Sequence, residues 1–264
     1  MINLIQGDCI KEMKKLADGS IDLTVTSPPY DNLRTYNGNN SLWSEQVWKD
    51  CIQELFRVTK QGGVVVWIVG DATIKGSETG TSFKQALWAI DCGFNLHDTM
   101  IFEKINYVPL THDRYEQSWE YMFILAKGKP KTFNPIKIPC KGAGKLEKYG
   151  LERRQNHGAS HSMRLYPNTE YIATKYTKIA RNIFSYTLGR EKTGHPAPFP
   201  EQLAHDHIIS WSNEGDTVLD CFLGSGTTGA VAKKLGRSFI GIELDPKYCG
   251  MAKTRTENVN TNLI

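Results

Sequence analysis

The chain has 264 residues, of which 40% are hydrophobic and 23% are charged, and its formal net charge is +4. A chain of this length and composition can bury one substantial core, and the composition excludes a disordered tail and a collagen-like protein. An acid already stands at Asp8, and no stretch approaches about eighteen consecutive apolar residues. We therefore expect a soluble, cytoplasmic protein with no membrane partner.

The cysteines predict neither disulfides nor a metal site. No two of the six form a CxxC pair, and none has a histidine at metal-ligand spacing. Reduced, mostly buried thiols are the expectation for a cytoplasmic protein. The six are Cys9, Cys51, Cys92, Cys140, Cys221 and Cys249.

The charge is unevenly distributed along the chain. From Lys127 to Lys192 there are fifteen Lys and Arg residues against four acids, whereas the remainder carries a net charge of −7. This asymmetry indicates that the basic segment faces a polyanion such as a nucleic acid. A solvated basic loop is the alternative.

The N-terminal third alternates between strand and helix patterns. An apolar strand ends at Gly7-Asp8 and leads into an amphipathic helix with Ile10, Met13 and Leu16 on one face. A second strand covers residues 20–27 and stops at Pro28-Pro29, because proline cannot donate a ladder hydrogen bond. An Asn- and Gly-rich loop, 31–43, precedes a helix over 45–60.

The alternation continues through a buried apolar strand at 64–71, a helix at 82–94 and a strand at 119–128. Residues 129–192 lack a strong period, so we predict an inserted subdomain or long functional loop there. The pattern then resumes with a helix at 200–212. A strand, a glycine-rich turn, a helix and a last strand follow at 217–222, 223–229, 230–236 and 238–245. This order predicts an α/β fold with a mainly parallel sheet.

The glycine-rich turn predicts a nucleotide-type cofactor site. Gly224-x-Gly226-x-x-Gly229 follows a strand and precedes a helix, with Glu243 at the end of the next strand. Asp220 would repel a pyrophosphate but suits a ligand with ammonium and sulfonium groups, which argues against nicotinamide and flavin. About twenty residues follow this motif, so the remaining strands must come from the N-terminal half. A purely structural turn is the alternative.

A second motif, Thr26-Ser27-Pro28-Pro29-Tyr30, stands where α/β folds place ligands, at the carboxyl end of a strand. The prolines fix the backbone, so the Pro28 carbonyl and the Ser27 hydroxyl form two neighbouring acceptors for an NH₂ group. Tyr30 offers a ring for a planar base. Accepting both hydrogens favours a nitrogen whose lone pair can attack an electrophilic methyl group. A Pro-Pro loop ended by a packed tyrosine is the alternative.

Together, the two motifs resemble those of β-class amino DNA methyltransferases, in which an SPPY-type motif precedes the FxGxGT cofactor motif. The resemblance implies a Rossmann-like fold with circularly permuted motif order and S-adenosyl-L-methionine as cofactor. It divides the chain into a catalytic half (1–128), a basic target-recognition insert (129–192) and a cofactor-binding half (193–264). It requires no metal and no cysteine nucleophile.

The resemblance also implies roles for individual residues. Ser27, Pro28, Pro29 and Tyr30, which we call the tetrad, would be catalytic. The cofactor-binding set would be Asp8, Cys9, Thr26, Phe199, Pro200, Asp220, Phe222, Gly224, Ser225, Gly226, Thr227 and Glu243. In the insert, Arg153, Arg154, Gln155, Asn156 and Arg164 are candidates for contacts with DNA.

The implied substrate is double-stranded DNA with a flipped target base. An initial serine in the tetrad is associated in this family more often with N4 of cytosine, and an initial aspartate with N6 of adenine, so we favour cytosine and keep adenine as the alternative. An inactive module that binds cofactor or DNA is a third hypothesis. A separate restriction endonuclease as partner, and a monomer or a homodimer, all remain open.

Overall fold

The computed structural model describes residues 1–30, 43–107, 114–140, 146–147, 171–172, 176–188 and 200–259. It divides into two compact units. The larger unit comprises Met1–Asn134 and Asn182–Ile264, and the smaller comprises Pro135–Arg181. In the described residues, no helix is both long enough and apolar enough to cross a membrane.

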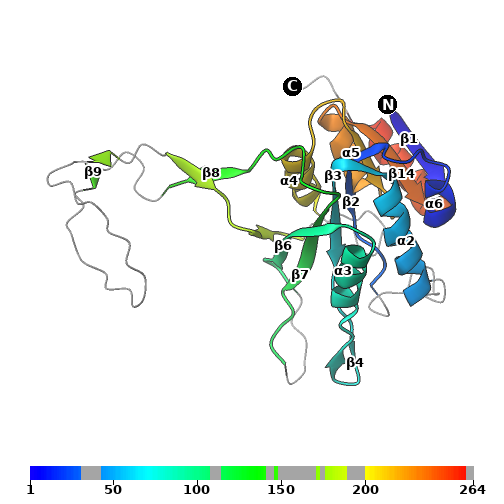
Figure 1. Ribbon diagram of the computed structural model, residues 1–264, viewed down its shortest axis with the longest axis horizontal. Helices are drawn as coiled ribbons and strands as arrows, with labels where there is room; N and C mark the ends of the chain where they lie inside the picture. The colour runs from blue at the N-terminus through cyan, green and yellow to red at the C-terminus, as the bar shows by residue number, and fades with distance from the viewer. Residues whose placement is uncertain are drawn as a thin grey trace. The chain divides into compact units, whose positions relative to one another are not determined.

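The larger unit is built on an eight-stranded sheet of order β1-β14-β13-β2-β3-β7-β6-β12 in the described part of the chain (Figure 1). Among these described strands, only β7 is antiparallel to its two neighbours, and the other neighbouring pairs are parallel. The sheet is therefore mainly parallel, as the alternating pattern predicts. Its strands are β1 (Ile2–Gln6), β14 (Ser238–Glu243), β13 (Thr217–Asp220), β2 (Ile21–Thr26), β3 (Thr59–Val69), β7 (Trp119–Ala126), β6 (Asn95–Lys104) and β12 (Ile183–Tyr186).

Helices cover both faces of this sheet, as in a doubly wound fold. One buried cluster joins the sheet to α1 (Cys9–Met13), α2 (Glu45–Val58) and α3 (Thr81–Asp91). A second cluster on the other face joins it to α4 (Glu201–Trp211), α5 (Thr227–Lys234) and α6 (Pro246–Glu257). The central strands are apolar on both faces because both are covered, which explains the continuous run Val64–Val69.

The smaller unit contains two short antiparallel pairs. Strand β8 (Lys137–Pro139) pairs with β11 (Thr177–Ile179), and β9 (Leu146–Glu147) pairs with β10 (Tyr171–Ile172). The separate unit is thus shorter than the predicted insert 129–192. Residues 182–188 belong to the larger unit because β12 adds to the sheet edge beside β6.

Most predicted elements are confirmed, with shifts at their ends, and several short or additional elements are absent from the prediction, among them β8 to β12 within 129–192. Helix α1 ends at Met13, so Leu16 lies beyond it. Strand β6, helix α6 and the short hairpin of β4 (Thr73–Ile74) with β5 (Ser77–Glu78) are absent from the prediction. The loop predicted over 31–43 lies outside the described residues except for Trp43.

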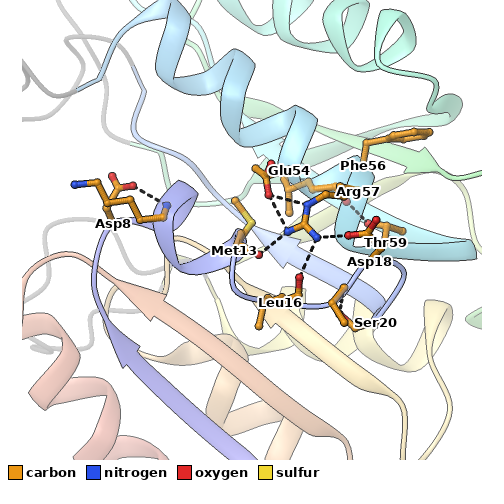
Figure 2. A network of polar contacts seen from close by, with 12 residues as sticks. Asp8, Met13, Leu16, Asp18, Ser20, Glu54, Phe56, Arg57 and Thr59 are labelled. Carbon is orange, nitrogen blue, oxygen red and sulfur yellow. Dashed lines mark hydrogen bonds and ion pairs between the residues drawn. The ribbon is translucent and has the colours of Figure 1, made fainter.

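One arginine holds the connection between α1 and β2 in place (Figure 2). Arg57, near the end of α2, donates to the carbonyls of Met13 at 2.7 Å and Leu16 at 2.9 Å. Its guanidinium also pairs with the carboxylates of Glu54 and Asp18. Backbone carbonyls in a non-helical turn need such donors, so Arg57 satisfies groups that no regular ladder reaches. The position of this connection determines where β2 starts.

We predict that Arg57→Met lowers the free energy of unfolding by about 2 kcal/mol, because it removes a charged donor from two backbone carbonyls and two carboxylates. The matched control is Lys15→Met, which removes a cation that pairs with Glu12 at 2.7 Å but is 68% exposed. That change is expected to cost less than about 1 kcal/mol. Equal losses for both variants in urea denaturation would contradict this role of Arg57.

Candidate functional site

Both sequence motifs lie at one edge of the sheet, where neighbouring strands end. Strands β13 and β2 are parallel neighbours, and β1 and β14 follow on the other side of β13. Their carboxyl ends therefore bring Asp8, Glu243, Asp220 and Ser27 together in the order β1, β14, β13, β2. After β13 the chain enters α5 on one face, whereas the chain after β2 leads to α2 on the other. Such a switch point is where open α/β sheets bind ligands.

The glycine-rich turn between β13 and α5 needs its glycine at 226. Gly226 has φ +82°, and a Cβ placed on it would lie 2.7 Å from Cα of Ala252 in α6. A side chain would be strained by the backbone conformation and would also collide with main-chain atoms. The turn therefore packs closely on α6 and presents the start of α5 at the sheet edge.

Asp220 ties the two motifs together. Its carboxylate is 1% exposed and accepts hydrogen bonds from Oγ1 of Thr26 at 2.7 Å, Oγ1 of Thr228 at 2.7 Å and the amide of Phe222 at 3.1 Å. Burial raises its pKa, while these hydrogen bonds act in the opposite direction. The side chain thus joins the end of β2 to the turn and to α5. Its predicted contact with a cofactor remains a prediction.

Glu243 and Asp8 carry carboxylates at the two adjacent strand ends. Glu243 accepts from the amides of Gly224 at 2.8 Å and Asp245 at 2.9 Å, and burial raises its pKa. Asp8 caps α1 by accepting from the amide of Lys11 at 2.9 Å. Each carboxylate oxygen has two acceptor positions, so both groups retain capacity for a further donor.

The tetrad leaves β2 directly into a polar network. Thr26 is fully buried and bonded to Asp220, while Ser27 and Tyr30 are half-buried. The Ser27 hydroxyl donates to the hydroxyl of Tyr30 at 3.0 Å, and Tyr30 donates to Oε2 of Glu120 at 2.7 Å. Oε1 of Glu120 in turn lies 2.5 Å from Nζ of Lys104.

Glu120 and Lys104 are site neighbours that the sequence analysis does not identify. Glu120 is the second residue of β7, which runs opposite to β3, and Lys104 is the last residue of β6. The antiparallel direction brings the start of β7 to the edge where the parallel strands end. A motif search by spacing has no signal for this, because it depends on the direction of one strand.

The other predicted residues divide into three groups. Cys9 is buried, and so is the neighbouring Cys221, whose Sγ lies 4.0 Å from Sγ of Cys51. Pro200 precedes α4, and Phe222 packs edge-on against Trp43. Ser225 is buried in the turn, and Thr227 is buried at the start of α5. Outside the described residues lie Phe199 and all five candidate DNA contacts, Arg153, Arg154, Gln155, Asn156 and Arg164.

A hollow of about 430 Å³ is lined by none of the predicted site residues, although Trp43 in its lining packs edge-on against Phe222. We therefore place the site by the strand ends and not by this hollow. Among the described residues, no group of three or more His, Cys, Asp or Glu side chains is arranged to hold a metal ion. The hollow is lined by Trp43, Ser44, Glu45, Trp48, Ile74, Thr79, Thr81 and Lys84.

Comparison with known proteins shows the family to which the chain belongs. A family model described as DNA methylase, N6_N4_Mtase, matches residues 21–254. The chain belongs to this N6/N4 DNA methylase family. The orphan methyltransferase M.BamHII of Bacillus amyloliquefaciens is 46% identical to this chain, and the match covers 93% of this chain and 92% of M.BamHII. The DNA adenine methyltransferase YhdJ of Escherichia coli K12 is 28% identical, over 96% of this chain and 82% of its own.

Solved structures share the Rossmann-like fold of the methylase. TTHA0409 of Thermus thermophilus, complexed with S-adenosyl-L-methionine, matches with a TM-score of 0.65 at 22% identity, over 100% of this chain and 98% of that one. The cytosine-N4-specific PvuII DNA methyltransferase matches with a TM-score of 0.69 at 20% identity, over 100% and 88% of the two chains. These likenesses establish the fold. The matches include both an adenine methyltransferase and a cytosine-N4-specific methyltransferase, so the comparisons do not decide which base this methylase modifies.

We predict that Gly226→Ala lowers the free energy of unfolding of the methylase by about 1–3 kcal/mol, because its φ and its contact with Ala252 both exclude a side chain. The control is Gly250→Ala within α6, where an added Cβ has open space. That change is expected to stabilise by up to about 1 kcal/mol. Thermal or urea unfolding measures both, and the same sign for both variants would contradict the close packing of the turn.

Proposed function

We propose that this DNA methyltransferase transfers a methyl group from S-adenosyl-L-methionine to the exocyclic amino nitrogen of a base flipped out of double-stranded DNA, with N4 of cytosine as the target. The observation that carries the proposal is the adjacency of the tetrad and the glycine-rich turn. They follow neighbouring parallel strands, and the 2.7 Å hydrogen bond between Thr26 and Asp220 joins them. A donor and an acceptor bound at these strand ends lie close enough to react.

The residues at the edge fit this cofactor by their charge. Asp8, Asp220 and Glu243 place three carboxylates at consecutive strand ends, which suits ammonium and sulfonium groups and repels phosphate. When bound there, the cofactor supplies an electrophilic methyl group. Glu243 would accept a hydrogen bond from a ribose hydroxyl, and Asp8 would accept one from the adenine amino group. The turn from Phe222 to Thr227, with Cys9, Thr26, Phe199 and Pro200, lines the remainder of the cofactor site.

The tetrad positions the target amine. Ser27 and the Pro28 carbonyl each accept one hydrogen of the NH₂ group, which frees the nitrogen lone pair from the ring and directs it at the methyl group. Pro29 holds the backbone, and Tyr30 stacks on the flipped base, a contact worth about 1–3 kcal/mol. Because the amine attacks directly, the reaction needs neither a cysteine nucleophile nor a metal.

Residues 129–192 are the target-recognition region in this proposal. Their excess of eleven positive charges over the segment from Lys127 to Lys192 supports contact with the phosphate backbone. Arg153, Arg154, Gln155, Asn156 and Arg164 are the proposed DNA contacts. Within the smaller unit, β8 and β11 carry the further cations Lys137 and Lys178.

The function is tested by incubating the chain with duplex DNA and methyl-labelled S-adenosyl-L-methionine and then analysing the nucleosides. We expect label in N4-methylcytosine, and a loss of at least about 100-fold in rate for Ser27→Ala, which removes one of two acceptors. Ser77→Ala in the exposed β4–β5 hairpin is the control. Label in N6-methyladenine would move the target to adenine. Label in neither nucleoside would contradict the proposal.

The DNA interface is tested by the salt dependence of binding. The double variant Arg153→Ala, Arg154→Ala is expected to lower DNA affinity at every salt concentration. If both side chains contact phosphates, the slope of log K against log salt falls by about 2. Lys233→Ala together with Lys234→Ala on α5 removes the same two charges outside the insert and is expected to leave the slope unchanged. Unchanged affinity and slope in the double variant would exclude these two arginines from the interface.

A further inference from the structure

Four side chains, one from β6, one from β7 and two from the tetrad, form a continuous polar network that ends at Ser27. From Lys104, the contacts run to Glu120 at 2.5 Å, on to the hydroxyl of Tyr30 at 2.7 Å, and from there to the Ser27 hydroxyl at 3.0 Å. The side chains of Lys104 and Glu120 are only 18% and 13% exposed. Water therefore competes weakly for this ion pair.

The chemistry of the end groups sets the direction of every hydrogen bond in this chain. Lys104 can only donate, and a carboxylate can only accept. Tyr30 must therefore donate its single proton to Glu120, and toward Ser27 it can only accept. Ser27 in turn directs its proton at Tyr30. Both remaining lone pairs of the Ser27 oxygen are left for acceptance.

This direction matters for an amino substrate. An NH₂ group approaching Ser27 presents hydrogens, and a serine whose own proton pointed outward would oppose it. We propose that Glu120, held by Lys104, is a positioning residue that acts through Tyr30 to keep the Ser27 hydroxyl in its accepting orientation. This inference rests on the proposed amino methyl transfer and concerns only residues of this chain.

The strand geometry supports a designated place for Glu120. Residue Phe102 of β6 pairs with Glu120 across the antiparallel ladder, and the Lys104 amide donates to the Ser118 carbonyl at 2.6 Å. At the end of β3, the Cβ position of Gly70 lies 3.4 Å from Cγ of Glu120 and 3.7 Å from the Tyr30 ring. Three adjacent strands thus converge on the carboxylate and the ring.

The isosteric change Glu120→Gln reverses the hydrogen-bond direction without removing volume. Lys104 would attract the amide oxygen of the glutamine, which turns its NH₂ group toward Tyr30. Tyr30 would then accept from the amide and could donate to Ser27. The Ser27 proton would point out toward the target amine, which weakens its acceptance of an amine hydrogen.

The test is a double-mutant cycle on the single-turnover rate of methyl transfer to duplex DNA. We expect Glu120→Gln to lower the rate about ten- to hundredfold, with affinities for S-adenosyl-L-methionine and DNA within about twofold of wild type. Tyr30→Phe keeps the stacking ring but removes the hydroxyl that links Glu120 to Ser27. In this background, Glu120→Gln should change the rate by less than about twofold. Glu103→Gln is the control. This carboxylate of β6 accepts from the Ser185 hydroxyl and takes no part in the polar network of Lys104, Glu120, Tyr30 and Ser27.

Equal rate losses from Glu120→Gln in the wild-type and Tyr30→Phe backgrounds would overturn the inference, as would a parallel loss of cofactor affinity or of thermal stability. Those outcomes would leave the proposed function standing, because wild-type transfer is measured in the same assay. Absence of any methyl transfer by the wild-type chain would instead remove the proposed function and this inference with it.

Discussion

The hydrogen bond between Thr26 and Asp220 is the contact on which the site depends. Strands β13 and β2 pair only through Val218 with Leu23 and Leu219 with Thr24, after which their chains leave for opposite faces of the sheet. The bond from Thr26 to Asp220 spans the point where the backbone ladder has ended. Because Asp220 also binds Thr228 in α5, one buried carboxylate fixes the tetrad relative to the glycine-rich turn. The relative position of two reacting groups is what an enzyme of this kind has to supply.

The same edge of the sheet carries negative charge at the ends of β1, β14 and β13, and a hydrogen-bonded polar network beside β2. Asp8, Glu243 and Asp220 follow one another along β1, β14 and β13, and burial raises the pKa of the last two. Backbone and hydroxyl donors hold these carboxylates in place. Beyond β2, Lys104 and Glu120 provide a paired charge that sets hydrogen-bond direction without adding net charge where the base would enter. In the proposed reaction, the carboxylates would face the cationic donor and the polar network would face the neutral amine.

The strand and helix patterns, the glycine-rich turn and the tetrad could be predicted because each has a local signal. Apolar runs mark the buried strands, Pro28-Pro29 marks the end of β2, and Gly226 marks a turn that excludes a side chain. The role of Asp220 was only partly predictable: its position at the strand end follows from sequence, but its bond with Thr26, 194 residues away, depends on which strands become neighbours. Glu120 and Lys104 have no local signal that marks them as neighbours of the tetrad. Their position depends on the antiparallel direction of β7, which follows from the connection between β6 and β7. The smaller compact unit ends before the predicted insert does for a similar reason: β12 is short, and in the described residues it joins the sheet through β6.

The central claim is that the tetrad binds the target base and the glycine-rich turn binds the methyl donor, so that the two form one active site. The most direct measurement is a crystal structure of the chain with S-adenosyl-L-homocysteine and a duplex that contains its target site. The account predicts a flipped base stacked on Tyr30, with its amino nitrogen within hydrogen-bond distance of the Ser27 hydroxyl and the Pro28 carbonyl. It also predicts the ribose of the bound nucleoside at Glu243. A base that remains stacked in the duplex, or a nucleoside bound away from the strand ends, would contradict it.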